Sequence, residues 1–118
     1  MKKFFSVLLL SLALFAFLLS SFPQETLAAN VCDAESVSKS ISGKVATKIT
    51  FVNKSNDLIK TYWLNYQGNR TYYYQLKSGQ GYTQQTYVTH PWVITDEQDN
   101  CLGVYYPDGQ ARTVNYSG

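Results

Sequence analysis

The segment TYVTHPW, residues 86–92, combines the side chains that are best suited to chemistry. It contains the only histidine of the chain, His90, and one of its two tryptophans, Trp92. Residues two apart share one face of a strand, so we expect the hydroxyl of Thr86, the imidazole and the indole to converge. The opposite face would carry the residues in between, Tyr87 and Thr89. Together a hydroxyl and an imidazole can bind a polar group beside an aromatic wall.

Two other interpretations of this segment stay open. Trp92 could be a core residue flanked by a half-exposed His90, with no ligand at all. Catalysis is the other interpretation, but a histidine that acts as a base needs a third group to orient it, and the sequence places no carboxylate in evident reach. We therefore expect a binding protein and no enzyme.

The N-terminus has the pattern of an export signal. Two lysines precede an apolar run from Phe4 to about Phe22, and small residues near Ala29 suit cleavage. We expect residues 1–29 to be a signal peptide and the protein to be secreted or periplasmic after cleavage. An apolar run of about 20 residues can also span a bilayer, so contact with a membrane is expected only if this segment stays uncleaved.

The charge of the chain limits which kinds of partner we expect for the residues after the signal segment. The chain has 118 residues and a formal net charge of +2 at pH 7, with no run of like charges. Without a basic patch we expect no nucleic acid and no anionic membrane surface as a partner. The part that follows the signal segment is long enough for one compact domain.

The two cysteines, Cys32 and Cys101, are expected to form a disulfide, because export favours oxidation and no cysteine is left over. In the chain-entropy model, closing a loop of about 70 residues stabilises a fold by about 4 kcal/mol. Zinc binding is the alternative, but further cysteines or a second histidine are missing. The acidic residues of the loop 96–99 could bind calcium, although such loops are usually solvated hairpins. We expect no metal and no cofactor.

The rest of the sequence predicts an all-β fold. Residues 44–53 alternate between two faces, as a half-buried strand does. Further segments rich in β-branched and aromatic residues recur about every ten residues, separated by turn sequences. They span residues 58–66, 70–76, 82–88, 91–95, 101–106 and 111–118. We expect a small β-sandwich from 44 to 118, preceded by an extended arm from 30 to 43 that Cys32 ties down, with a short helix at 33–40 as the alternative.

Three motifs resemble those of a known family. The segments ITFVNKS (49–55), WLNYQG (63–68) and THPW (89–92) are similar, in order and spacing, to the β domain of the von Hippel-Lindau tumour suppressor family. The resemblance covers about residues 45–110. It implies a small β-sandwich that recognises 4-hydroxyproline in a peptide or protein ligand.

The resemblance also implies which residues form the pocket. Trp63 and Trp92 match its two aromatic walls, and Tyr73 matches a tyrosine that bonds the ligand's backbone. Thr86 replaces a serine, and His90 matches a histidine; these two would hydrogen-bond the ligand's hydroxyl group. An unhydroxylated proline would leave both unpaired at about 1 to 3 kcal/mol per buried group, which predicts a preference of about 10² to 10⁴ for hydroxyproline.

The departures from the family limit what the resemblance implies. Gln85 replaces a histidine next to the pocket, and residues 69–78 replace a proline-rich stretch, so ligand contacts outside the pocket are expected to differ. We also expect a stand-alone β domain that lacks the helical domain through which the tumour suppressor joins a ubiquitin ligase. Ubiquitin-ligase subunits are therefore not expected as partners.

Two alternatives to hydroxyproline binding stay open. The many tyrosines could stack on sugar rings, as in a carbohydrate-binding module. The sandwich could instead keep its pocket only as part of its structure. The deciding observation is whether the candidate ligand-binding residues line one accessible cavity. These residues are Trp63, Tyr73, Thr86, His90 and Trp92.

Overall fold

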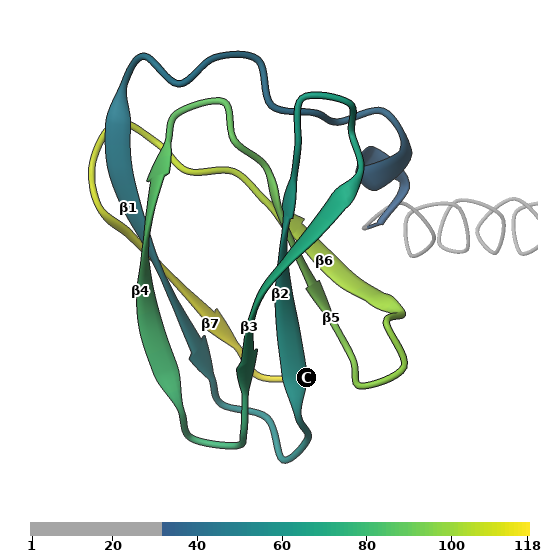
Figure 1. Ribbon diagram of the computed structural model, residues 1–118. Coiled ribbons are helices and arrows are strands. Elements are labelled where there is room, and N and C mark those ends of the chain that lie inside the picture. The colour runs from purple at the N-terminus through teal and green to yellow at the C-terminus, as the bar shows by residue number, and fades with distance from the viewer. Residues whose placement is uncertain (1–31) are drawn as a thin grey trace, which may run out of the picture. The chain divides into compact units, whose positions relative to one another are not determined.

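A computed structural model of the chain describes residues 32–118, which form seven strands in two sheets (Figure 1). The predicted all-β sandwich is confirmed. The expected signal peptide, residues 1–29, lies outside the described residues. Within residues 32–118, no helical segment has the length and apolar character that crossing a membrane requires.

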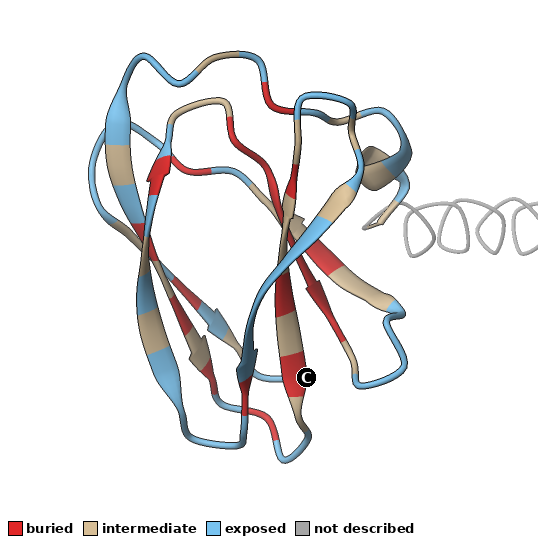
Figure 2. Cartoon of the chain, viewed as in Figure 1, coloured by how far each residue is buried: buried red, intermediate tan, exposed pale blue. Residues whose placement is uncertain are grey.

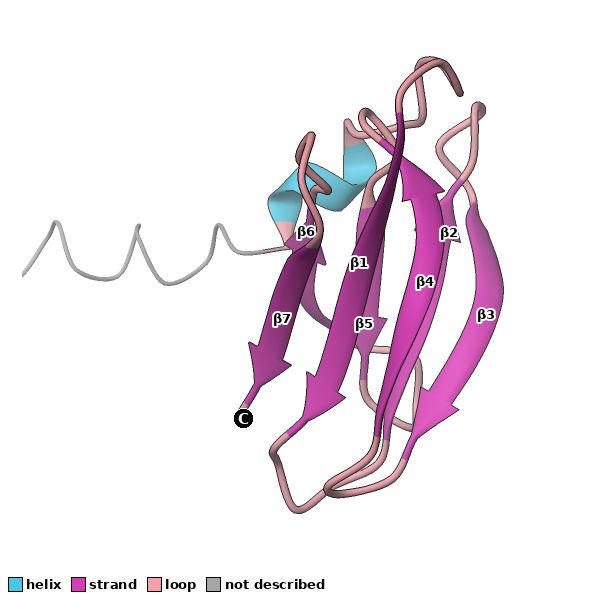
Figure 3. Ribbon diagram, turned by 90° about the vertical axis from the view of Figure 1, so that its left-hand side faces the viewer, coloured by secondary structure: helices cyan, strands magenta, loops and turns pink. Residues whose placement is uncertain are grey.

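The chain passes from one sheet to the other several times, so strands that follow each other in sequence often belong to different sheets. One sheet has the strand order β4 (Gly81–Tyr87), β1 (Ala46–Asn53), β7 (Arg112–Tyr116), and β1 pairs antiparallel with β4 and parallel with β7. The other sheet is antiparallel, with the order β3 (Arg70–Leu76), β2 (Ile59–Leu64), β5 (Trp92–Thr95), β6 (Cys101–Tyr105). In the side view, the edge strands β3 and β4 lie next to each other (Figure 3). Tyr74 of β3 and Tyr82 of β4 stack with their ring centroids 4.4 Å apart, so the two edges are in contact through these rings.

The core lies between the sheets (Figure 2). In β1 the predicted alternation buries Ile49 and Phe51 completely and leaves Thr50 and Val52 partly exposed. Burying one such large apolar side chain stabilises the fold by about 1.5 to 3 kcal/mol. The other buried apolar side chains of the cluster come from both sheets: Ile59, Leu76, Trp92, Ile94 and Val114.

Residues 86–92 do not form one strand. β4 ends at Tyr87 and β5 begins at Trp92 in the other sheet, with a turn in which the His90 N–H donates to the Tyr87 carbonyl at 3.1 Å. Thr89 in this turn has a φ of 83°. The prediction that alternate residues of the segment share one strand face is therefore wrong, because the chain changes sheets between them.

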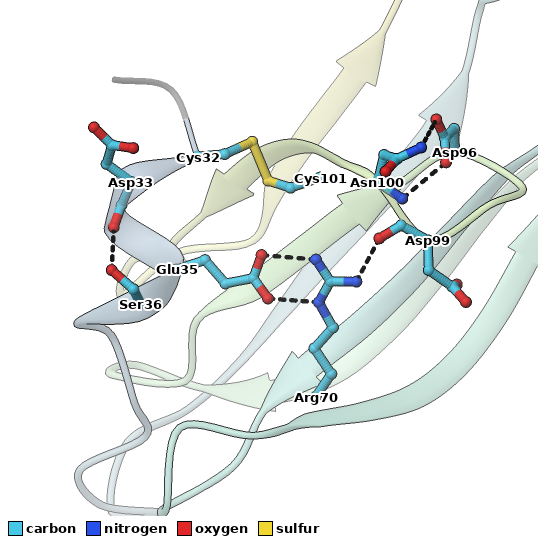
Figure 4. Close-up of a disulfide and its surroundings, with 9 residues drawn as sticks. All are labelled: Cys32, Asp33, Glu35, Ser36, Arg70, Asp96, Asp99, Asn100 and Cys101. Carbon is cyan, nitrogen blue, oxygen red and sulfur yellow. Dashed lines mark hydrogen bonds and ion pairs between the residues drawn. A yellow bond between two sulfur atoms is a disulfide. The ribbon is translucent and has the colours of Figure 1, made fainter. Parts of the chain in front are cut away.

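The residues before β1 form an arm, defined here as residues 32–43. Its helical part is a single 3-10 turn, η1 (Asp33–Ser36), shorter than the helix considered for residues 33–40. The predicted disulfide between Cys32 and Cys101 is confirmed, and it joins the start of the arm to β6 with a Cα–Cα distance of 6.0 Å (Figure 4).

Candidate ligand-binding site

A pocket of about 230 Å³ lies where the edge strands β3 and β4 approach the crossing segment 88–91. All the ligand-binding residues predicted from the sequence line it: Trp63 from β2, Tyr73 from β3, Thr86 from β4, His90 from the crossing, and Trp92 from β5. Gln85 and Tyr87 complete the lining. The pocket thus draws its walls from both sheets, although the predicted reason for the convergence, a common strand face, does not hold.

A β-bulge supplies one wall of the pocket. In the pairing of β2 with β3, Thr61 is opposite Tyr74 and Tyr62 is opposite Tyr72, so Tyr73 is an extra residue. Such an extra residue bends a strand and re-aims its side chain. The ring of Tyr73 meets that of Trp92 edge-on, with a centroid distance of 4.8 Å.

The indole of Trp92 forms another wall of the pocket and is itself held on two sides. It is almost fully buried and packs on Phe51 with a centroid distance of 5.9 Å. Its Nε1–H donates to the hydroxyl oxygen of Thr86 at 3.0 Å. Thr86 thereby uses its hydroxyl as an acceptor and keeps the hydroxyl proton for a further bond.

His90 lies between three aromatic rings and is only 7% exposed. Its ring is nearly parallel to that of Trp63 at a centroid distance of 5.2 Å, and Tyr66 and Tyr87 contact it at 5.4 and 5.2 Å. Its Nε2 is 3.1 Å from the hydroxyl of Tyr66. Burial lowers the pKa of His90, and a hydrogen bond to the backbone of Ser42 opposes this more weakly. The imidazole is therefore neutral at pH 7.

Trp63, the second indole of the pocket, has a hydroxyl partner of its own. Its Nε1–H donates to the hydroxyl of Ser40 at 2.7 Å, and Ser40 in turn donates to the carbonyl of Leu64 at 2.7 Å. The two tryptophans of the pocket are thus each fixed by one hydroxyl, from the arm for Trp63 and from β4 for Trp92.

Three residues of this arrangement were not predicted from the sequence. Tyr66 carries a usable signal, because it is the aromatic residue of the WLNYQG motif. Tyr87 was expected on the opposite face, and it lines the pocket because β4 ends there. Ser40 has no local signal, since its partners lie more than twenty residues further along the chain.

The internal hydrogen bonds change the expected selectivity. Within residues 32–118, every buried side-chain nitrogen or oxygen has a hydrogen-bond partner. Thr86 and His90 already have partners in Trp92 and Tyr66, so an unhydroxylated proline would leave only the free hydroxyl proton of Thr86 unpaired, and we expect a smaller preference than 10² to 10⁴. A gained hydrogen bond contributes about 0.5 to 1.5 kcal/mol net, which corresponds to about 2- to 10-fold in affinity.

Charge is concentrated away from the pocket, whose lining side chains are all neutral at pH 7. The acidic loop after β5 uses its carboxylates internally: Asp96 accepts from the backbone N–H groups of Gln98 and Asn100, and Asp99 pairs with Lys60 at 3.1 Å. Across residues 32–118, no three or more metal-ligating side chains come together. The pocket suits a neutral ligand group with an apolar ring and a hydroxyl.

Comparison with protein-family models matches residues 38–106 to the VHL (von Hippel-Lindau) beta domain. The matched range contains every residue of the pocket, together with Ser40 and Tyr66. Cys32 and the turn η1 precede it. A search of curated proteins finds no match to the chain.

Proposed function

Because the chain belongs to the von Hippel-Lindau β-domain family, we propose that it binds a peptide or protein ligand, with a 4-hydroxyproline ring as the group that enters the pocket. The observation that carries the proposal is the hydroxyl of Thr86 placed in a neutral pocket between the Trp63 and Trp92 walls.

The chemistry of the ligand ring fits these walls. A pyrrolidine ring is apolar and rigid, so it packs on aromatic faces with little loss of conformational freedom. The hydroxyl on such a ring would accept the free proton of Thr86. His90 offers its stacked ring, while its Nε2 is already beside the Tyr66 hydroxyl. We therefore expect Thr86 to be the main partner of the ligand's hydroxyl group.

The proposal is a non-enzymatic binding role outside the cytosol. His90 has aromatic rings, a tyrosine hydroxyl and a backbone group as neighbours, which suits binding better than proton transfer. The disulfide is consistent with an extracytoplasmic location. The family match concerns the β domain, so a ubiquitin-ligase role is not part of the proposal.

One observation favours carbohydrate binding as a second candidate. Around the pocket, several tyrosine rings are exposed by about two fifths or more: Tyr66, Tyr73 and Tyr87. Exposed rings of this kind can stack on sugars as well as on proline. Both candidates need the aromatic residues, but only hydroxyproline recognition requires a difference between two peptides that differ in one hydroxyl.

The test is a calorimetric titration with two matched peptides, one with 4-hydroxyproline and one with proline. We expect the unmodified protein to prefer the hydroxylated peptide by about 2- to 10-fold. Thr86→Val should remove the preference, and Thr86→Ser, which keeps the hydroxyl, should retain it. Equal affinities in the unmodified protein would contradict hydroxyproline recognition. Binding of oligosaccharides but of neither peptide would favour the carbohydrate candidate.

A further inference from the structure

Ser40 joins the arm to one wall of the pocket. It is 2% exposed, although Val37 and Ile41 on either side of it are 83% and 75% exposed. Besides its hydroxyl contacts with Trp63 and Leu64, its backbone N–H donates to the carbonyl of Asn65 at 3.1 Å. The only buried residue of the arm therefore makes three hydrogen bonds to the end of β2.

Ser42 joins the arm to the segment that carries His90. Its backbone N–H donates to the Thr89 hydroxyl at 3.1 Å, and this hydroxyl donates to the Ser42 carbonyl at 3.0 Å. Thr89 has a φ of 83°, which β-branched residues rarely adopt. Such a conformation persists only where surrounding contacts hold it. The two bonds to Ser42 are among these contacts, together with the backbone hydrogen bonds of Val88 to Val45 and of His90 to Tyr87.

The beginning of the arm is anchored on the four-stranded sheet (Figure 4). The Cys32–Cys101 disulfide ties it to β6, and the Glu35 carboxylate receives two hydrogen bonds from Arg70 of β3, at 2.5 and 2.7 Å. Arg70 also donates to the carbonyl of Asp99 at 2.7 Å. Since the end of the arm continues into β1, both of its ends are fixed, and Ser40 and Ser42 lie between the two anchors.

We propose that the arm is a positioning element of the pocket, in which Ser40 orients the Trp63 wall and Ser42, through Thr89, holds the segment that carries His90. The effect on ligand binding rests on the proposed function, but the positioning itself does not depend on any ligand. A side chain that must be ordered during binding weakens the affinity by about 2- to 10-fold. A preset Trp63 indole avoids that loss.

The two indoles allow a test with an internal control. Each donates to a different hydroxyl, so NMR of the two indole N–H signals reports on the two partners separately. In Ser40→Ala we expect the Trp63 signal to shift and its hydrogen exchange to accelerate at least several-fold, with the Trp92 signal unchanged. Ser36→Ala is the matched control, because that arm serine bonds only within η1, to the carbonyl of Asp33. An unchanged Trp63 signal in Ser40→Ala would overturn the role of Ser40.

Thr89→Gly tests the second contact and is expected to fold, because glycine suits a positive φ. It removes both bonds between the Thr89 hydroxyl and Ser42 but leaves the hydrogen bond of the His90 ring to the Ser42 backbone. We expect the His90 ring signals to shift and broaden, while the hydrogen exchange of the Trp63 indole N–H, which keeps its Ser40 partner, stays the same. Unchanged His90 signals would overturn the role of the contact between Ser42 and Thr89.

Titration of the two peptides separates the positioning from the proposed function. We expect Ser40→Ala to weaken the hydroxyproline and proline peptides alike, by about 2- to 10-fold, because both rings use the Trp63 wall. Equal affinity of Ser40→Ala and the unmodified protein would contradict the effect on binding. If the unmodified protein binds neither peptide, the proposed function fails, and the NMR signals still decide whether the arm positions the pocket.

Discussion

Thr86 and Trp92 belong to different sheets, yet the indole of Trp92 donates to the Thr86 hydroxyl at 3.0 Å. This bond ties the end of β4 to the start of β5 across the crossing segment. The same hydroxyl is the proposed partner of a ligand, so one residue contributes to both stability and recognition.

The first prediction concerns the stability contribution of this bond. Thr86→Val keeps the volume but leaves the buried Trp92 N–H without a partner, which costs about 1 to 3 kcal/mol in the free energy of unfolding. Thr83→Val on the same strand is the control, because the Thr83 hydroxyl pairs with Thr50 at an exposed position. We expect that change to cost less than about 0.5 kcal/mol. Urea unfolding measures both, and equal losses would contradict the role of the Trp92 bond.

The second prediction concerns the disulfide. Replacing Cys32 and Cys101 together by alanine should lower the free energy of unfolding by about 2 to 5 kcal/mol, because the bond closes a loop of 69 residues in the unfolded chain. Thermal and urea unfolding of the two proteins measure the difference. Glu35→Gln, which weakens only the partly exposed ion pair with Arg70, should cost less than about 1 kcal/mol. A larger loss from Glu35→Gln than from the cysteine pair would contradict this ranking.

The third prediction concerns Tyr66, whose hydroxyl lies beside Nε2 of His90. Tyr66→Phe keeps the ring but frees this nitrogen, so a ligand hydroxyl can bind both Thr86 and His90. We expect the preference for the hydroxyproline peptide to rise by about 2- to 10-fold. In the absence of ligand the free energy of unfolding should fall by about 1 to 3 kcal/mol, because the buried Nε2 of His90 loses its partner. Calorimetry with the two peptides measures the ratio. A fall in the preference would show instead that Tyr66 itself bonds the ligand.

The fourth prediction concerns pH. In the unfolded chain His90 has its ordinary pKa of about 6.5. In the folded protein, burial lowers the pKa of His90 below this value. Between the two values the unfolded state holds more protons, so stability is complete above about pH 6.5 and decreases as the pH falls below it. The rings that face His90, those of Trp63, Tyr66 and Tyr87, provide no carboxylate to reverse this sign.

The measurement is urea unfolding at several values between about pH 7.5 and pH 5. His90→Gln should lose the dependence in this window, because the unfolded chain then has no imidazole to protonate. Asp96 and Asp99 also have lowered pKa values, through hydrogen bonds with Asn100 and Tyr62 respectively, but they titrate at more acidic pH. Unchanged or higher stability at pH 5 in the unmodified protein would contradict the prediction.

The fold was predictable from patterns within short segments, whereas five of the seven residues that line the pocket were predicted from the family resemblance. The alternation in β1 predicted a half-buried strand, and one of its faces buries Ile49 and Phe51. The motifs around Trp63 and Trp92, through the resemblance, predicted the aromatic walls. The change of sheet between Tyr87 and Trp92 was not predictable, since an extended segment looks the same in sequence whether it stays in one sheet or crosses to another.

The contacts that fix the pocket depend on tertiary structure and leave no local trace. The run of three tyrosines at 72–74 has no alternation that would indicate a bulge at Tyr73. Ser40 is one of several serines in the arm, and only its bonds to the end of β2 distinguish it. The internal partners of Thr86 and His90 likewise became visible only in the structure, and they reduce the selectivity expected from the sequence.

The bulge at Tyr73 also affects the edge of the sheet that β3 forms. β3 is an edge strand with three exposed tyrosines, a composition that favours pairing with the edge of another molecule. An extra residue in the middle of such a strand interrupts the regular row of backbone donors and acceptors that a second strand would need. The irregularity that aims a tyrosine into the pocket therefore also protects an otherwise aggregation-prone edge.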